Sequence, residues 1–276
     1  MKHTTAVRPP AVSGMFYPRD PGVLTRELAS LLRQEANSGT RGTIRGVISP
    51  HAGYQYSGFT AAKAYALLNG MQYETVIIVS PSHREYFDAV SVFQGDAYET
   101  PLGTVSLDGA LRESLIHACP FVVASDAGHG EEHAIEVQLP FLQHTLGSFT
   151  LLPIVIGKQD RAYCLGLGEA LGTILAGRNY LLVASTDLSH YHTSEVAETL
   201  DRRTIDDVAA FDYEGMMAGL ESGTTEACGG GPTVAVMAAL QRLGVKHIEI
   251  LHHCNSGDIT GDRARVVGYF SAVAYE

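Results

Sequence analysis

Residues 75–83, with the sequence TVIIVSPSH, decide the fold of this chain. Four apolar residues follow one another from Val76 to Val79, with no polar residue between them. A strand that is apolar on both faces is typical of a parallel sheet covered by helices on both sides. His83 follows this run within a few residues. We therefore expect a buried strand with a chemically useful side chain beyond its carboxyl end.

The same order of apolar run, polar turn and amphipathic stretch repeats along most of the chain. The expected strands are residues 43–49, 75–80, 90–93, 104–107, 150–156, 180–185, 246–252 and 264–274. The expected helices are residues 23–32, 57–68, 111–118, 132–146, 162–175, 195–210 and 213–221, and a last helix that opens at residues 229–232 and ends at Leu243. We expect Pro140 to break or kink the helix over 132–146.

Strands that alternate with helices predict an α/β fold with a largely parallel central sheet flanked by helices. No internal repeat or linker divides the chain, so we expect a single domain over residues 1–276. Residues 1–43 are expected to form an N-terminal arm and a helix packed on that domain.

The composition limits the class of protein. The chain has 276 residues, of which 45% are hydrophobic and 18% charged, which is enough apolar material for a large core. The formal net charge of −11 argues against nucleic acid or an anionic membrane as a partner, because both need a basic surface. We expect no secretory signal and no membrane span. The four cysteines are scattered singly, which favours a reducing cytoplasm over a disulfide framework.

Five side chains stand at the ends of these elements and could carry chemistry. His51, His83 and His190 each follow an apolar strand, and Asp187 lies just before His190. Cys228 precedes the last long helix, whose dipole favours a thiolate. Because loops at the carboxyl ends of parallel strands meet over one edge of the sheet, we expect these side chains around one pocket. Imidazole and thiolate together suit iron, copper or zinc, and suit magnesium or calcium poorly.

Each of these residues also has an ordinary structural explanation. A lone histidine at a strand end is usually a hydrogen-bonded structural residue, and a lone cysteine is more often a small buried hydrophobic side chain. Tyr54 could bond a ligand or belong to the core, and Glu132 and His133 could reach the pocket or cap a helix at the surface. A P-loop is excluded because no Lys-Ser/Thr pair follows residues 229–231, and the chain has no Gly-x-Ser-x-Gly elbow of a serine hydrolase.

Several short motifs resemble one known family when they are taken together. They are Arg8-Pro9-Pro10-Ala11-Val12-Ser13-Gly14-Met15-Phe16-Tyr17-Pro18, Pro50-His51-Ala52-Gly53-Tyr54, Pro81-Ser82-His83, Glu132-His133-Ala134-Ile135-Glu136, Ser185-Thr186-Asp187-Leu188-Ser189-His190 and Cys228-Gly229. They occur in the order of the Memo family, also called AmmeMemoRadiSam system protein B. The resemblance runs from Arg8 to the final strand. Each motif is weak alone, but the ordered set is highly specific.

The resemblance implies a fold like that of the class III extradiol (LigB-type) dioxygenases, in which two histidines and a glutamate hold a non-haem iron. Carried over by motif, His51 and His83 are implied as metal ligands and Cys228 as the third ligand. His190 then matches the acid/base histidine, with Asp187 beside it. The chain departs from these enzymes because a thiolate stands where they have a carboxylate, which shifts the preference towards copper or zinc. The family name also implies radical-SAM and AMMECR1-like proteins as partners.

Three functions agree with these observations. The first is a metal-dependent redox protein, a non-haem oxidoreductase that holds iron or copper and acts on a small molecule. In it His190 transfers protons, Asp187 orients His190 or a bound water, and Tyr54, Glu132 and His133 contact the substrate or support the ligands. The second is a non-catalytic module that binds a metal or a protein in the same cleft. The third is a zinc-dependent hydrolase.

Overall fold

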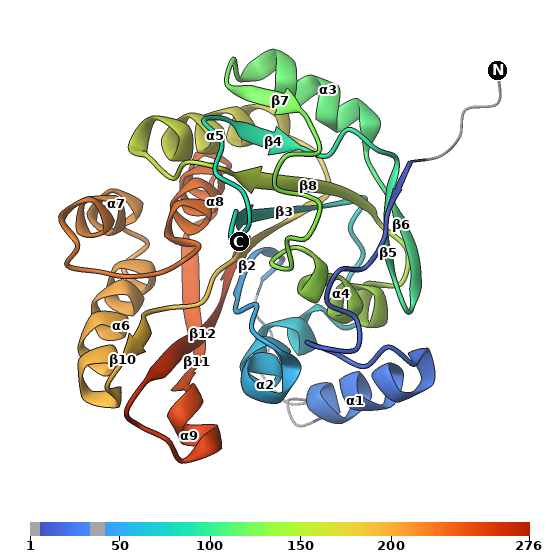
Figure 1. The fold of residues 1–276 in the computed structure, drawn as a ribbon. Coiled ribbons are helices and arrows are strands. Elements are labelled where there is room, and N and C mark those ends of the chain that lie inside the picture. The colour runs from blue at the N-terminus through green and yellow to red at the C-terminus, as the bar shows by residue number, and fades with distance from the viewer. Residues whose placement is uncertain (1–5, 34–41) are drawn as a thin grey trace.

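The structure of the protein, a computed structural model, describes residues 6–33 and 42–276 (Figure 1). A large sheet runs through the centre, helices cover both of its faces, and a small sheet lies at one side (Figure 1). Of the expected N-terminal segment over residues 1–43, positions 1–5 and 34–41 lie outside the described residues. No helix in the described part of the chain is both long and apolar enough to cross a membrane.

The large sheet is built around parallel strands. Its strands are β2 (Ile44–Ser49), β3 (Thr75–Pro81), β4 (Val90–Val92), β7 (Val122–Ala124), β8 (Thr150–Ile156), β9 (Tyr180–Ser185), β10 (His190–His192), β11 (His247–Asn255) and β12 (Val266–Tyr275). They lie in the order β10-β12-β2-β9-β3-β8-β4-β7, and β11 pairs with β12. The four strands β2, β9, β3 and β8 are mutually parallel, while β12 and β4 join them antiparallel. The carboxyl ends of β2, β9 and β3 therefore meet at one edge.

Two layers of helices cover the sheet. One face carries α3 (Gly109–Ala118), α5 (Arg161–Ile174), α6 (Ser194–Ala209), α7 (Tyr213–Ser222) and α8 (Gly230–Arg242). The other face carries α1 (Pro21–Arg33), α2 (Tyr54–Tyr65), the 3-10 turns η1 (Ala66–Leu68) and η2 (Glu136–Gln138), and α4 (Leu139–Leu146). The short helix α9 (Ser256–Thr260) follows β11.

The side chains of β3 explain why its sequence is apolar without alternation. Ile77 and Val79 belong to the core under α5 and α8, whereas Val76 and Ile78 belong to the core under α2 and α4. All four are fully buried. The predicted α/β fold with a largely parallel, helix-covered sheet is confirmed, and β8 and β9 have the predicted bounds.

A small sheet holds the N-terminal arm against the domain. It consists of β1 (Val7–Arg8), β5 (Ala97–Thr100) and β6 (Gly103–Ser106), with β1 parallel to β5 and β5 antiparallel to β6. Figure 1 shows the blue arm passing beside β5 and then over α4 towards α1. The sequence patterns did not predict β1 or β5, because β1 has only two residues and β5 has the sequence AYET, in which only the first two residues are apolar.

The prediction of a helix over 132–146 is wrong in its first half. Residues 125–135 form turns and irregular backbone, and regular helix begins only at Leu139. The carboxylate of Glu132 accepts the N–H groups of His133 and Ala134, and this local bonding competes with helix formation. Pro140 lies in the first turn of α4, where its missing N–H is not needed, so it does not kink a longer helix.

Candidate metal centre

The loops after β2, β3 and β9 surround one pocket of about 440 Å³, a size that suits a small molecule. His51 follows β2, His83 follows β3, and Asp187 and His190 follow β9. The lining residues are Met15, Phe16, His51, Ala52, Gly53, Gln55, Tyr56, His83, Arg84, His133, Asp187, His190, Tyr191, Val267 and Tyr269. The structure therefore brings the three predicted histidines together at the expected edge of the sheet.

His51 is buried and its ring has a fixed orientation. Its Nδ1 lies 3.0 Å from Oγ of Ser185. That hydroxyl donates its hydrogen to the carbonyl of Ala134 at 2.7 Å, so Nδ1 of His51 must be the donor and Nε2 keeps its lone pair. Burial, followed by the nearby His83, lowers the pKa of His51 well below its ordinary value. The ring is therefore a neutral imidazole whose Nε2 carries a lone pair that can bind a cation.

His83 is oriented by a carboxylate. Its Nδ1 lies 2.9 Å from Oε1 of Glu132, and its backbone N–H donates to Oε2 at 2.6 Å. Burial alone would raise the pKa of Glu132, but its hydrogen bonds with His83 outweigh burial and lower this pKa to about 2. Because an ionised carboxylate only accepts, Nδ1 of His83 carries a hydrogen, and in the neutral ring Nε2 is the nitrogen that can bind a cation. Carboxylate-bound histidines of this kind are common metal ligands.

His190 and Asp187 lie on the β9 side of the pocket. The Nδ1 of His190 donates to the carbonyl of Leu188 at 2.8 Å, so in the neutral ring Nε2 is the acceptor. The Oδ1 atom of Asp187 accepts the N–H of His51 at 2.7 Å. Burial raises the pKa of Asp187, and the hydrogen bond from His51 opposes that rise. A backbone carbonyl therefore orients His190, and the carboxylate of Asp187 anchors the loop of His51.

Cys228 approaches from the turn before α8. Its Sγ lies 3.1 Å from Nε2 of His51 and 3.3 Å from the backbone nitrogen of Asp187. Burial, and next the carboxylate of Asp187, raise the pKa of the Cys228 thiol well above its ordinary value. Burial thus outweighs the helix dipole that favoured a thiolate in the sequence. The thiol is protonated at neutral pH in the metal-free protein, and a cation must displace this proton to bind.

These donors fit a transition-metal ion. His51, His83 and Cys228 each offer one atom, and the three atoms lie within 4.8 Å of one another. Ligands held 2.0–2.3 Å from a tetrahedral ion lie roughly 3.5 Å apart, so small adjustments bring all three onto one ion. Two neutral imidazoles and a thiolate suit iron, copper or zinc. The chain can therefore hold a metal through this His/His/Cys group.

His133 and Glu132 lie beside this group. The centre of the His133 ring lies 4.8 Å from that of His83, on which it stacks, and 4.8 Å from that of Phe16. Burial, followed by His51, lowers the pKa of His133 to about 3, and its Nδ1 has no hydrogen-bond partner in the described part of the chain. A second group of donor atoms, from His83, Glu132 and His133, also lies within 4.8 Å of one another. Glu132, however, already accepts four N–H bonds, so it serves to hold His83.

Tyr54 does not line the pocket. It is buried between Tyr17 and Phe141, and its hydroxyl donates to the carbonyl of Val137 at 2.8 Å. Its place is the core, the second of the two alternatives left open by the sequence.

Other aromatic side chains do reach the pocket and were missed. Tyr56 and Tyr191 lie at its mouth, and Phe16 comes from the N-terminal arm. Tyr191 has a φ of 64°, a left-handed conformation that is rare for a bulky residue and is often found at functional sites. The Arg8–Pro18 motif was the available sign that the arm contributes to the site.

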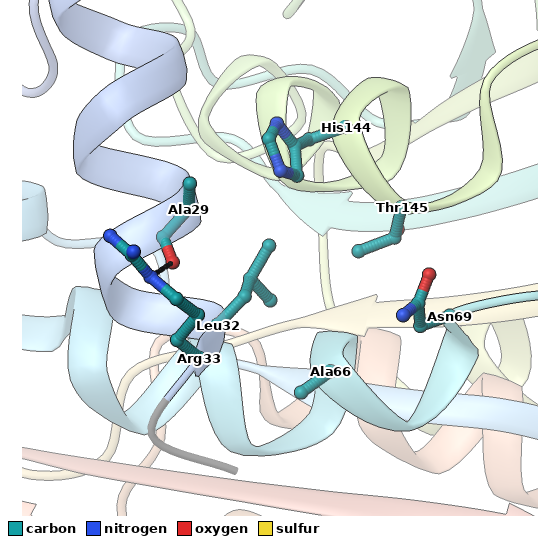
Figure 2. Close-up of a pocket in the computed structure, with 7 residues that line it drawn as sticks. All are labelled: Ala29, Leu32, Arg33, Ala66, Asn69, His144 and Thr145. Atoms are coloured by element: carbon teal, nitrogen blue, oxygen red, sulfur yellow. Dashed lines mark hydrogen bonds between the residues drawn. The ribbon is translucent and has the colours of Figure 1, made fainter. Parts of the chain in front are cut away.

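A second cavity, of about 270 Å³, lies between α1, η1 and α4 (Figure 2). Figure 2 shows its lining residues, which are Ala29, Leu32, Arg33, Ala66, Asn69, His144 and Thr145. Arg33 folds back onto its own helix and donates to the carbonyl of Ala29 at 2.9 Å. With one histidine and no acidic or thiol side chain among these seven, this cavity is not a metal site.

The comparisons with known proteins agree over almost the whole chain. A family model described as Memo-like protein matches residues 8–273. A MEMO1 family protein of Methanothermobacter thermautotrophicus is 38% identical over 272 residues, which cover 95% of this chain and 98% of that protein. A MEMO1 family protein of Methanopyrus kandleri is 37% identical over 278 residues, which cover 96% and 98%.

A solved structure is similar in fold. The crystal structure of an uncharacterized protein from Escherichia coli K12 matches with a TM-score of 0.50 at 14% identity, over 85% of this chain and 100% of that one. At this identity the match concerns the fold alone.

Proposed function

We propose that this chain, which belongs to the Memo family, is a metal-dependent redox protein that binds iron or copper through His51, His83 and Cys228. One observation carries the proposal: three donor atoms from distant parts of the chain lie within 4.8 Å of one another beside an open pocket. The hydrogen bonds to Ser185 and Glu132 place a hydrogen on Nδ1 of each ligand histidine, so Nε2 is the nitrogen that can bind the ion. Such pre-orientation is what a metal site requires.

When bound, an iron or copper ion supplies electron transfer and an open position for a small ligand. The chain's own residues supply the rest. His190 presents Nε2 at the pocket, where it can accept a proton from a small substrate or return one. The carboxylate of Asp187 keeps the loop of His51 in place. Phe16, Tyr56 and Tyr191 line the pocket with aromatic rings.

The test is elemental analysis of protein purified without added metal, combined with oxygen uptake in the presence of a reductant. Iron or copper at about one ion per chain, with oxygen uptake above that of the free ion, supports the proposal. Zinc together with hydrolytic activity would replace it with the zinc-dependent hydrolase. A cleft that stays metal-free after incubation with iron, copper and zinc would leave the non-catalytic binding module.

The role of His190 is tested with a matched pair of variants. We expect His190→Gln to keep the metal content of the protein. Its turnover, measured as oxygen uptake, should fall by about 10²- to 10⁴-fold, because a proton-transfer group is lost. His117→Gln is the control, since His117 lies on α3, bonds the carbonyl of Glu113 at 2.7 Å and does not line the pocket. Equal turnover in the two variants would exclude His190 as the acid/base.

A further inference from the structure

Arg8, on the N-terminal arm, is bonded to the loop that carries Glu132. Its guanidinium is 3% exposed and lies 5.1 Å from the centre of the Tyr98 ring. It donates through Nε to the carbonyl of His129 at 2.9 Å, through Nη2 to the carbonyl of Glu132, and through Nη1 to the carboxylate of Glu136. One side chain therefore bridges the loop over 129–136.

This loop needs such support because it has no regular secondary structure between positions 125 and 135. Glu136, at its end, is fully buried and is the second anchor. Its carboxylate accepts the N–H of Ala11 at 2.7 Å, the N–H of Val12 at 3.0 Å and the hydroxyl of Tyr17 at 2.5 Å. All three partners belong to the arm. Arm and loop are thus held together by charge-assisted bonds between buried groups.

The loop in turn holds His83. Residues 82–86 after β3 are half-buried or exposed, so the core does not fix the ring. Glu132 bonds both Nδ1 and the backbone nitrogen of His83. A second contact runs from Phe16 of the arm to His133 and from His133 to His83. The chain of contacts from Arg8 to His83 is continuous.

We propose that Arg8 is a positioning residue for the metal ligand His83, acting through the main chain of Glu132. This inference rests on the proposed metal site. It adds that a residue of the arm, far from the ligands in sequence, sets the affinity of the site. The docked arm keeps the Glu132 carboxylate where it points Nε2 of His83 at Cys228 and His51.

The test variant is the double substitution Arg8→Gln/Glu136→Gln, which removes both buried charges and so leaves neither unpaired. The single variant Arg8→Gln is made beside it. The control is Arg112→Gln, because Arg112 also holds a loop by bonds to the carbonyls of Phe93 and Gly95, away from the pocket. The affinity for Zn²⁺ is measured by competition with a chelator, on samples whose folded state is verified by circular dichroism.

We expect Zn²⁺ to bind about tenfold more weakly to the double variant, as for other partners of metal-ligating histidines, and unchanged to Arg112→Gln. In the metal-free proteins, ¹⁵N NMR of histidine should show His83 with hydrogen on Nδ1 in the wild type and a mixture of tautomers in the double variant. A purely structural role would lower the melting temperature without moving either readout.

A folded double variant with wild-type Zn²⁺ affinity and a wild-type His83 tautomer would overturn the inference. A wild-type protein that binds no Zn²⁺, iron or copper would instead contradict the proposed function. In that case the tautomer of His83 in the single variant Arg8→Gln still decides whether Arg8 positions His83.

Discussion

The two sides of the candidate metal centre are built in different ways. On the inner side His51 is 1% exposed, and the strand ends hold it through Ser185 and Asp187. Cys228 lies against the same strand end. On the outer side the ring of His83 is 27% exposed and stands on an exposed loop, where the carboxylate of Glu132 orients it. The sheet thus fixes the inner donors, and a side-chain network fixes the outer one.

This difference predicts different effects of the two sides on folding and on metal binding. An inner ligand is also part of the core, so its loss should affect folding and metal binding together. The outer ligand, His83, is held by Glu132, which lies 49 residues further along the chain. Arg8 of the arm bonds Glu136, which lies 128 residues further along. Loss of His83 should affect metal binding with little effect on folding.

The largest expected effect comes from deleting a ligand on each side. Both His51→Ala and His83→Ala should lose tight metal binding, because the loss of one of three protein ligands costs several kcal/mol. In the metal-free protein, His51→Ala should lower the free energy of unfolding by about 2–4 kcal/mol, since it leaves a cavity and buried groups without partners. His83→Ala should lower it by about 1 kcal/mol or less. Urea denaturation and metal titration measure the two quantities.

Equal destabilisation by the two substitutions would contradict the proposed difference between the inner and the outer side. Unchanged metal occupancy in His83→Ala would contradict the metal centre itself.

A smaller effect is expected when the support of the outer ligand is weakened. Glu132→Gln should reduce metal affinity by about 10- to 100-fold, because an amide cannot accept all four N–H bonds that the carboxylate accepts. Glu131→Gln is the matched control, since its side chain is exposed at the adjacent position. Competition with a chelator measures the metal affinity of both variants. Similar affinities of Glu132→Gln and Glu131→Gln would show that His83 does not depend on Glu132.

The smallest effect concerns pH and belongs to the inner side. The raised pKa of Cys228 means that one proton competes with the metal at neutral pH, so affinity should rise with pH, about tenfold per unit between about pH 7 and 8.5. His51 adds nothing to this slope, because its lowered pKa keeps it neutral there. Cys228→Ser should bind more weakly and with a flatter profile. A wild-type affinity independent of pH would indicate that the thiol is not a ligand.

Much of the architecture could be predicted from the sequence, because it depends on local patterns. The apolar runs that became β3, β8 and β9 are fully buried on both faces, and only parallel strands between helix layers provide that environment. The position of His51, His83 and His190 just after such runs predicts that they lie at one edge of the sheet.

The tertiary structure decided what local patterns could not express. Residues 132–138 looked helical, but Glu132 and Glu136 bond to His83 and Arg8, which are distant in sequence, and these bonds determine the backbone there. The hydrogens on Nδ1 of the ligand histidines, the raised pKa of Cys228 and the core position of Tyr54 depend in the same way on neighbours far along the chain. Periodicity reports which face of an element is buried, whereas the chemistry of a site depends on which side chains meet there, and that is set only when the whole chain packs.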